Sequence, residues 1–162
     1  YIIKTNLNGG IVFQKTYGGS FLEKGMDIVR KDNRDGYIVL GQECKHRYDV
    51  HACGPITKVM ILDIDENGNN LDQTFLGGLK FYEFGTPMAL ASTLNGGYVF
   101  TTNPRNGGNV WLYKWGNFDD HLNLKISPGG FGGESIERTN DNGYIISTGG
   151  GTVLKTDSEL LY

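Results

Sequence analysis

The chain has 162 residues, of which 38% are hydrophobic and 20% charged, and its formal net charge is −3. This length predicts one domain with a core of ordinary size rather than two large domains. The 15 Lys and Arg residues are scattered, so no basic face for nucleic acid is predicted. No apolar run approaches the ~18 to 20 residues that cross a bilayer, so no transmembrane segment is expected.

Short apolar stretches, each bounded by turn residues, follow one another along the whole chain. Most of them alternate between apolar and polar residues, which predicts strands rather than helices. A short helix at 86–92 is disfavoured because this segment matches a strand position elsewhere in the chain. In chain order, strands are expected within 2–10, at 11–15, at 26–30, within 34–41, at 58–62, 70–75 and 87–92, within 95–102, at 110–114, 121–126 and 135–138, within 141–148 and at 153–155.

Three signatures recur in a fixed order and reveal an internal repeat. A Gly-Tyr pair opening an apolar stretch lies in 34–41, 95–102 and 141–148. A Gly-Gly pair after a strand lies in 15–20, 75–79 and 127–131, and a strand running into an Asp/Asn turn lies in 2–10, 60–70, 112–120 and 153–159. Four antiparallel strands in a unit of roughly fifty residues are typical of a β-propeller blade.

The repeat pattern predicts a single repeat region that spans 1–162. It divides into a half blade at 1–17 with strands three and four, complete blades at 18–76 and 77–127, and a partial blade at 128–162. A closed propeller needs at least ~4 blades, so the pattern favours an incomplete ring or a segment of a longer propeller. Open sheet edges then invite association with another chain. A β-trefoil, which closes with this amount of chain, and a three-turn solenoid are the alternatives.

The order of the motifs KTN, KTYGGS and DGYIVLG resembles the blade repeats of secreted and cell-surface β-propeller proteins of bacteria, of the kind abundant in Bacteroidetes-type secretomes. The resemblance covers nearly the whole chain, and its motifs are signals for turns and packing. It implies a secreted or surface-exposed protein, and it carries no catalytic signature.

The stretch CKHRYDVHAC, 44–53, lies in a strand two to strand three loop that is longer here than in the other units. Cys44, His46, His51 and Cys53 are zinc ligand types, but four ligands within ten residues leave little room for a tetrahedral site. A Cys44–Cys53 disulfide is favoured instead, with free thiols as a third alternative. The bridge would hold a loop that displays His46, Arg47, Tyr48, Asp49 and His51.

Aromatic residues gather in the Gly-Gly loops, which in a propeller share a face with this insertion. They could pack between blades, or they could stack on sugar rings or hold a protein partner. The candidate ligand-binding residues are Phe21, His46, Arg47, Tyr48, Asp49, His51, Phe81, Tyr82, Phe84, Arg105 and Phe131.

The stretch DIDENGNNLD, 63–72, resembles an EF-hand loop, in which Asp63, Asp65 and Asn67 would bind Ca²⁺. The twelfth position is Thr74 instead of glutamate, and the flanking elements are predicted strands. Lys4 and its counterpart in the last repeat occupy the position of Asp63. A simple turn is therefore favoured, and calcium is kept as an alternative. No other cofactor or metal is expected.

Catalytic motifs are not found: the sequence has no G-x-S-x-G elbow, no phosphate loop that opens a helix and no H-E-x-x-H. We expect a module that acts by binding, in adhesion, extracellular assembly or glycan recognition, with a protein or glycan as its partner. The alternative is a part of an extracellular carbohydrate-active enzyme, a glycoside hydrolase or lyase, whose acids on the site face would be Glu23, Asp49, Glu83 and Glu134.

Overall fold

The structure is a computed structural model with all-β architecture, and the part of the chain that it describes contains no helix. It describes residues 1–32, 34–44, 47–49, 52–53, 57–76, 85–103, 110–115, 122–126 and 132–161. For residues 47–49, 52–53, 57 and 122–126 it describes the backbone alone. The all-β prediction is confirmed for these residues.

Apart from one two-stranded hairpin, the described strands form four antiparallel sheets that follow one another along the chain, and all the expected strands are present. The first sheet contains β1 (Ile2–Thr5) and β2 (Ile11–Lys15); the second contains β3 (Leu22–Arg30), β4 (Tyr37–Cys44), β7 (Thr57–Ile64) and β8 (Asn70–Leu76); the third contains β9 (Thr86–Ser92), β10 (Tyr98–Asn103), β11 (Val110–Trp115) and β12 (Leu122–Ile126); and the fourth contains β13 (Gly133–Arg138), β14 (Tyr144–Thr148) and β15 (Val153–Thr156). Between β4 and β7, β5 (Arg47–Asp49) and β6 (Ala52–Cys53) form a small separate hairpin.

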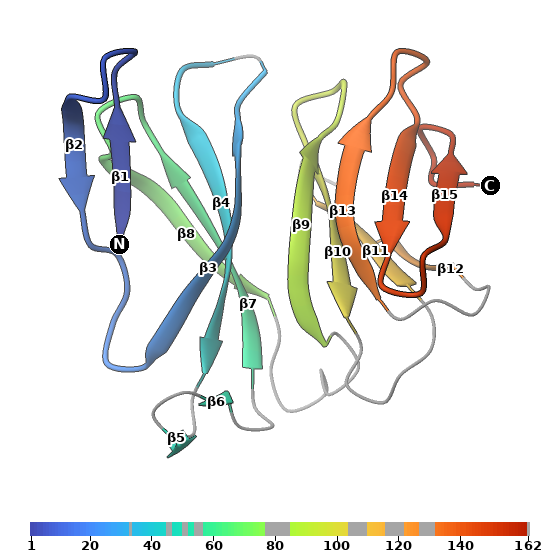
Figure 1. Cartoon of the computed structure of the whole chain (residues 1–162), viewed down its shortest axis with the longest axis horizontal. Helices are drawn as coiled ribbons and strands as arrows, with labels where there is room; N and C mark the ends of the chain where they lie inside the picture. The colour runs from blue at the N-terminus through green and yellow to red at the C-terminus, as the bar shows by residue number, and fades with distance from the viewer. Residues whose placement is uncertain are drawn as a thin grey trace.

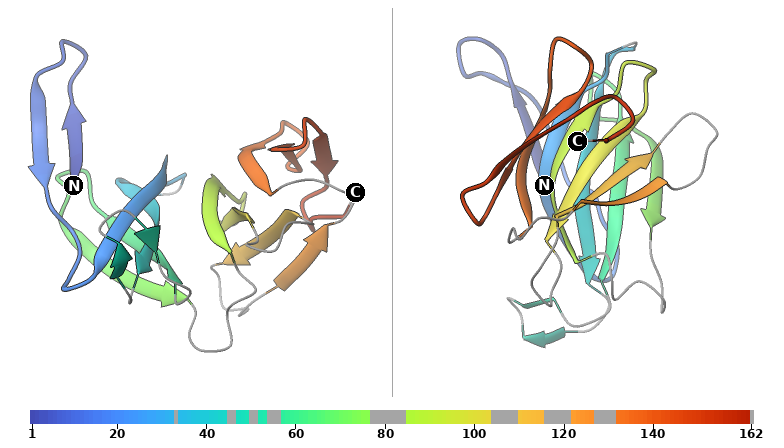
Figure 2. Two further views of the ribbon diagram at one scale, coloured as in Figure 1. Left: turned by 60° about the horizontal axis from the view of Figure 1, so that its bottom comes forward. Right: turned by 90° about the vertical axis from the view of Figure 1, so that its right-hand side faces the viewer.

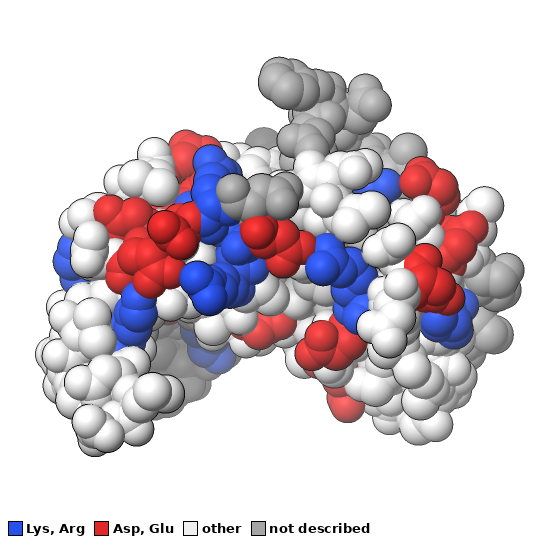
Figure 3. Space-filling view, turned by 90° about the horizontal axis from the view of Figure 1, so that it is seen from above, with Lys and Arg blue, Asp and Glu red and all other residues white. Residues whose placement is uncertain are grey.

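The four sheets stand side by side in an arc, with the first and fourth sheets at its two ends (Figures 1 and 2). Strands β3, β9 and β13, the first strands of the second, third and fourth sheets, lie next to one another on the inner side of the arc. In the space-filling view the molecule is correspondingly hollowed on one side (Figure 3). This arrangement alone does not decide between the expected propeller and the alternative trefoil.

The core lies between the faces of neighbouring sheets, in three separate clusters. Val39, Leu62 and Ile64 of the second sheet are buried against Ile2 and Phe13 of the first. The second and third sheets enclose a larger cluster, which contains Ile38, Leu40, Val59, Ile61, Leu90, Tyr98, Phe100 and Tyr113, with Trp111 and Trp115 at its border. The third and fourth sheets enclose Ala89, Ala91, Val99, Val110, Leu112, Ile136, Tyr144, Ile146, Leu154 and Leu160. A sheet with neighbours on both sides buries both of its faces, which explains the continuous apolar runs of β4 and β10.

Six of the turns share one geometry, which explains the recurring Asn and Asp residues. In each turn the first residue donates its N–H to the carbonyl of the fifth, and the fourth donates to the carbonyl of the first; the first residues are Asn6, Asp65, Thr93, Thr139, Thr148 and Asp157. The fourth residue always has a positive φ, as at Gly68 and Asn142. This is the three-residue hairpin loop in which a left-handed residue follows a type I turn. At five of these six turns the side chain of the first residue accepts a further backbone N–H, and at the turn that begins with Thr139 the Asp141 side chain accepts the N–H of Gly143.

A β-bulge recurs at the same repeat position in the first strand of three sheets. The register skips Met26 in β3, Met88 in β9 and Glu134 in β13. Such an extra residue bends and twists its strand, and here it does so on the inner side of the arc. Strand β3 therefore begins at Leu22, four residues before the predicted start at Met26, because pairing continues on both sides of the bulge.

Candidate binding surfaces

The segments predicted to bind a ligand adjoin the same end of the sheets. In the second sheet Leu22, Cys44 and Thr57 are register partners, so β3 begins, β4 ends and β7 begins at one level. The third and fourth sheets repeat this, and Figure 1 shows that these strand ends lie on the lower side of their sheets, the side on which the β5–β6 hairpin also lies. We call this the long-loop end, and the opposite end, with the turns that follow β3, β7, β9 and β13, the turn end.

The predicted site residues divide according to what the structure describes of them. Phe21 is described in full, directly before β3, and its side chain is 42% exposed. Arg47, Tyr48 and Asp49 are placed by their backbone on β5. Outside the described residues lie His46, His51, Phe81, Tyr82, Phe84, Arg105 and Phe131. The topology thus brings the flanking strands of these segments to one end, while contacts among the side chains remain a prediction.

The two cysteines lie at the two ends of the insertion in the second sheet. Cys44 is buried as the last residue of β4, and Cys53 ends β6, where only the backbone is described. The disulfide between them stays a prediction. His46 and His51, the histidines of the zinc alternative, lie outside the described residues. Within the described part, no three His, Cys, Asp or Glu side chains lie close enough together to bind a metal ion.

The inner side of the arc carries a polar groove of about 380 Å³ lined by β3, β9 and β13. Two carboxylates connect these strands. Asp27 Oδ2 accepts a hydrogen bond of 2.7 Å from the backbone N–H of Leu90, and Asp32 Oδ2 accepts bonds from Ser92 Oγ at 3.0 Å and Arg138 Nη1 at 2.6 Å. Sequence reasoning missed both carboxylates, because Ala89 and Ser135 stand at the repeat position of Asp27 and no motif marks it.

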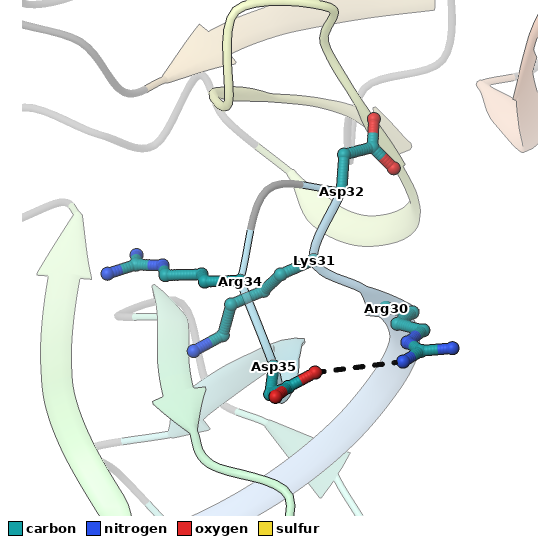
Figure 4. Close-up of a pocket in the computed structure, with 5 residues that line it drawn as sticks. All are labelled: Arg30, Lys31, Asp32, Arg34 and Asp35. Atoms are coloured by element: carbon teal, nitrogen blue, oxygen red, sulfur yellow. Dashed lines mark ion pairs between the residues drawn. The ribbon is translucent and has the colours of Figure 1, made fainter.

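The turn end carries a dense mixture of charged side chains (Figure 3). Arg30, Lys31, Asp32, Arg34 and Asp35 line a cavity of about 540 Å³ there. Figure 4 shows Lys31 and Arg34 pointing to one side of the loop, while Arg30 and Asp32 point to the other. Lys31 and Arg34 both pair with Asp63, the latter at 2.9 Å, and Arg30 lies 3.8 Å from Asp35. These charges are compensated locally, so the cavity presents no concentrated charge of one sign.

Two of the predicted calcium ligands, Asp63 and Asp65, are engaged in other contacts. The Asp65 carboxylate accepts the backbone N–H groups of Asn67 and Asn69, as expected for the first residue of a turn. The Asn69 N–H groups hold the pKa of Asp65 below its usual value. The Asp63 carboxylate forms ion pairs with Lys31 and Arg34. The turn interpretation accounts for the contacts of Asp65, and calcium binding remains an untested alternative.

The pKa values of four groups, Lys4, Glu66, Tyr98 and Tyr144, are shifted further away from pH 7. The hydrogen bond between Lys4 and Glu66 lowers the pKa of the Glu66 carboxyl and raises the pKa of the Lys4 ammonium. Burial raises the pKa values of Tyr98 and Tyr144. General acids and bases have pKa values close to the working pH, so Lys4, Glu66, Tyr98 and Tyr144 are poorly suited to that role.

Comparison of the chain with models of known protein families and with curated protein sequences gives no match. No helix in the described ranges has the length and apolar character to cross a membrane.

Proposed function

We propose that the chain is a secreted or surface-exposed module of β-propeller-type repeats that acts by binding a protein or a glycan through its long-loop end. The finer fold assignment is supported by the sheets themselves. In the second and third sheets the order in space follows the order in the chain from the inner strand outward, apart from the β5–β6 hairpin, and successive sheets pack face to face. A trefoil would instead close part of its strands into a barrel with hairpins across one end.

The observation that carries the binding proposal is the common level of the strand ends at the long-loop end. The segments next to these ends hold most of the predicted aromatic and polar contact residues, and they come from three different sheets. Surface loops on a rigid sheet scaffold are the usual place for binding residues. A Cys44–Cys53 disulfide, as proposed from the sequence, would fix the longest of these loops and reduce the entropy lost on binding.

The proposal is tested with an array of plant and bacterial polysaccharides, on which retention of the purified chain is measured. The Tyr48→Ala and Phe21→Ala variants should each weaken retention at least about tenfold, since aromatic rings commonly dominate such contacts. Leu94→Ala is the matched control, because Leu94 is 59% exposed and lies at the turn end.

Two outcomes would contradict the proposal. Equal retention of both aromatic variants and the wild type would place the binding surface elsewhere. Release of reducing sugar that disappears in Asp49→Asn or Glu83→Gln would instead establish the hydrolase alternative.

A further inference from the structure

The two sheets at the ends of the arc each leave one apolar face uncovered. On the fourth sheet, Ile145 is 42% and Val153 is 63% exposed. On the first sheet, Ile3 is 47% and Val12 is 50% exposed. Figure 2 shows that these sheets lie at opposite ends of the arc, so that one copy of the chain does not cover either face with the other.

The internal repeat shows what covers the equivalent residues of the fourth sheet. Ile145 is the register partner of Lys155 in the fourth sheet, and Val99 is the register partner of Lys114 in the third. Ile145 and Val99 therefore occupy the same repeat position. Val99 is completely buried, because the fourth sheet packs over it. In the second sheet the corresponding residue is Ile38, which is 1% exposed beneath the third sheet.

The position of Val153 leads to the same result. It corresponds to Ile61 in β7 and Leu112 in β11, which are 2% and 0% exposed. On the first sheet, Ile3 corresponds to Leu62 and Leu154, which are 1% and 9% exposed beneath the preceding sheet. Both uncovered faces are thus halves of the same sheet-to-sheet junction that occurs inside the chain.

A lysine contact specifies how the two halves fit. Lys4 Nζ of the first sheet donates to the backbone oxygen of Glu66 at 3.0 Å, and Lys114 Nζ of the third sheet donates to that of Ser158 at 3.4 Å. Both acceptors are the second residue of a turn in the next sheet. Lys155 holds the same position in the fourth sheet. The matching acceptor is the backbone oxygen of Leu7, whose side chain is fully exposed.

We propose that a second copy of this chain docks head to tail, with the first sheet of one copy packed on the outer face of the fourth sheet of the other. Ile3 of the incoming copy then covers Ile145 and Val153, and Lys155 donates to its Leu7 carbonyl. The contact is heterologous, so it generates a closed ring if the rotation closes and an open array if it does not. It uses neither the long-loop end nor the ligand proposed above, and it stands independently of that function.

The test uses sedimentation velocity of the whole chain over a range of concentrations. The wild type should show a mass that rises with concentration. Val153→Lys and Ile3→Lys should each weaken association at least about tenfold, because each places a charge in an apolar contact. Leu94→Lys, exposed at the turn end, should associate like the wild type. Circular dichroism verifies that each variant is folded.

A mixture of the two lysine variants distinguishes head-to-tail docking from any symmetric dimer. Val153→Lys keeps an intact first sheet, and Ile3→Lys keeps an intact fourth sheet, so an equimolar mixture should form a heterodimer that grows no further. A wild type that stays monomeric at every concentration, or a mixture that fails to associate, would overturn the proposal. If these faces bind a different partner instead, the wild type alone stays monomeric.

Discussion

The Gly-Tyr motif permits a quantitative test of why glycine precedes the tyrosine. A Cβ on Gly143 would lie 2.0 Å from the carbonyl oxygen of Thr156 and 2.6 Å from Lys155 Nζ, whereas ordinary contact begins at 3.4 Å. Thr156 is the register partner of Tyr144, the first residue of β14. Alanine therefore requires β14 and β15 to separate by more than an ångström where their pairing begins.

Overpacking of this kind costs about 1 to 3 kcal/mol, and the obstacle here is backbone rather than a flexible side chain, so we expect Gly143→Ala to cost about 2 to 3 kcal/mol. For a chain of this length each kcal/mol lowers the melting temperature by about 2 to 4 °C, so a fall of about 4 to 12 °C is expected.

The assay is thermal and urea unfolding followed by circular dichroism. Gly36→Ala should show a loss of similar or greater size, because its Cβ would lie 2.1 Å from the Ile64 carbonyl oxygen. Gly25→Ala is the control: this glycine is in β3, and its added Cβ meets nothing within 4 Å. The steric explanation is wrong if Gly143→Ala unfolds within about 0.5 kcal/mol of Gly25→Ala.

Three further predictions concern other contacts. Lys4 lowers the pKa of Glu66, so the pair stabilises the fold above pH 4.5 and this stabilisation is lost as the pH falls; Glu66→Gln should flatten the acid limb of a stability–pH curve. An unchanged acid limb would show that the pair contributes nothing. Leu112→Ala should cost about 2 to 5 kcal/mol in denaturant unfolding, whereas Val153→Ala, at the equivalent exposed position, should change stability by less than about 0.5 kcal/mol in dilute solution. Equal losses would contradict the assignment of the uncovered face. The intact chain should weigh two hydrogens less than its reduced form if Cys44 and Cys53 are bridged, and a mass unchanged by reduction would exclude the bridge.

The strands could be predicted from the sequence because short-range patterns determine them. Alternation, the Asn/Asp turns and the Gly-Tyr pair all act over a few residues, and they placed even 86–92 correctly as a strand. The comparison of repeats also assigned Lys4, Asp63 and Lys155 to one structural position, which the strand registers confirm. This position could be found without knowing what each side chain contacts.

Those contacts could not be predicted, because they depend on neighbours in other sheets. Asp27 bonds to Leu90, which is 63 residues away in the chain, and Arg138 pairs with Asp32, 106 residues away. The bulge at Met26 leaves no local signal either, since methionine, methionine and glutamate occupy that position in the three sheets. The candidate site depends on long loops in the same way, so the sequence predicts residues for it without arranging them.

The position shared by Lys4, Asp63 and Lys155 shows how one repeat site acquires opposite charges. In the fourth sheet, Lys155 on β15 pairs at 2.9 Å with Asp141 in the turn between β13 and β14. In the second sheet the signs are exchanged, with Asp63 on β7 and Lys31 at the turn between β3 and β4. Lys31 is almost completely buried, and a buried cation is tolerated only beside an anion. Asp63 compensates the charges of Lys31 and Arg34, which gives a structural reason for the carboxylate that makes 63–72 resemble a calcium loop.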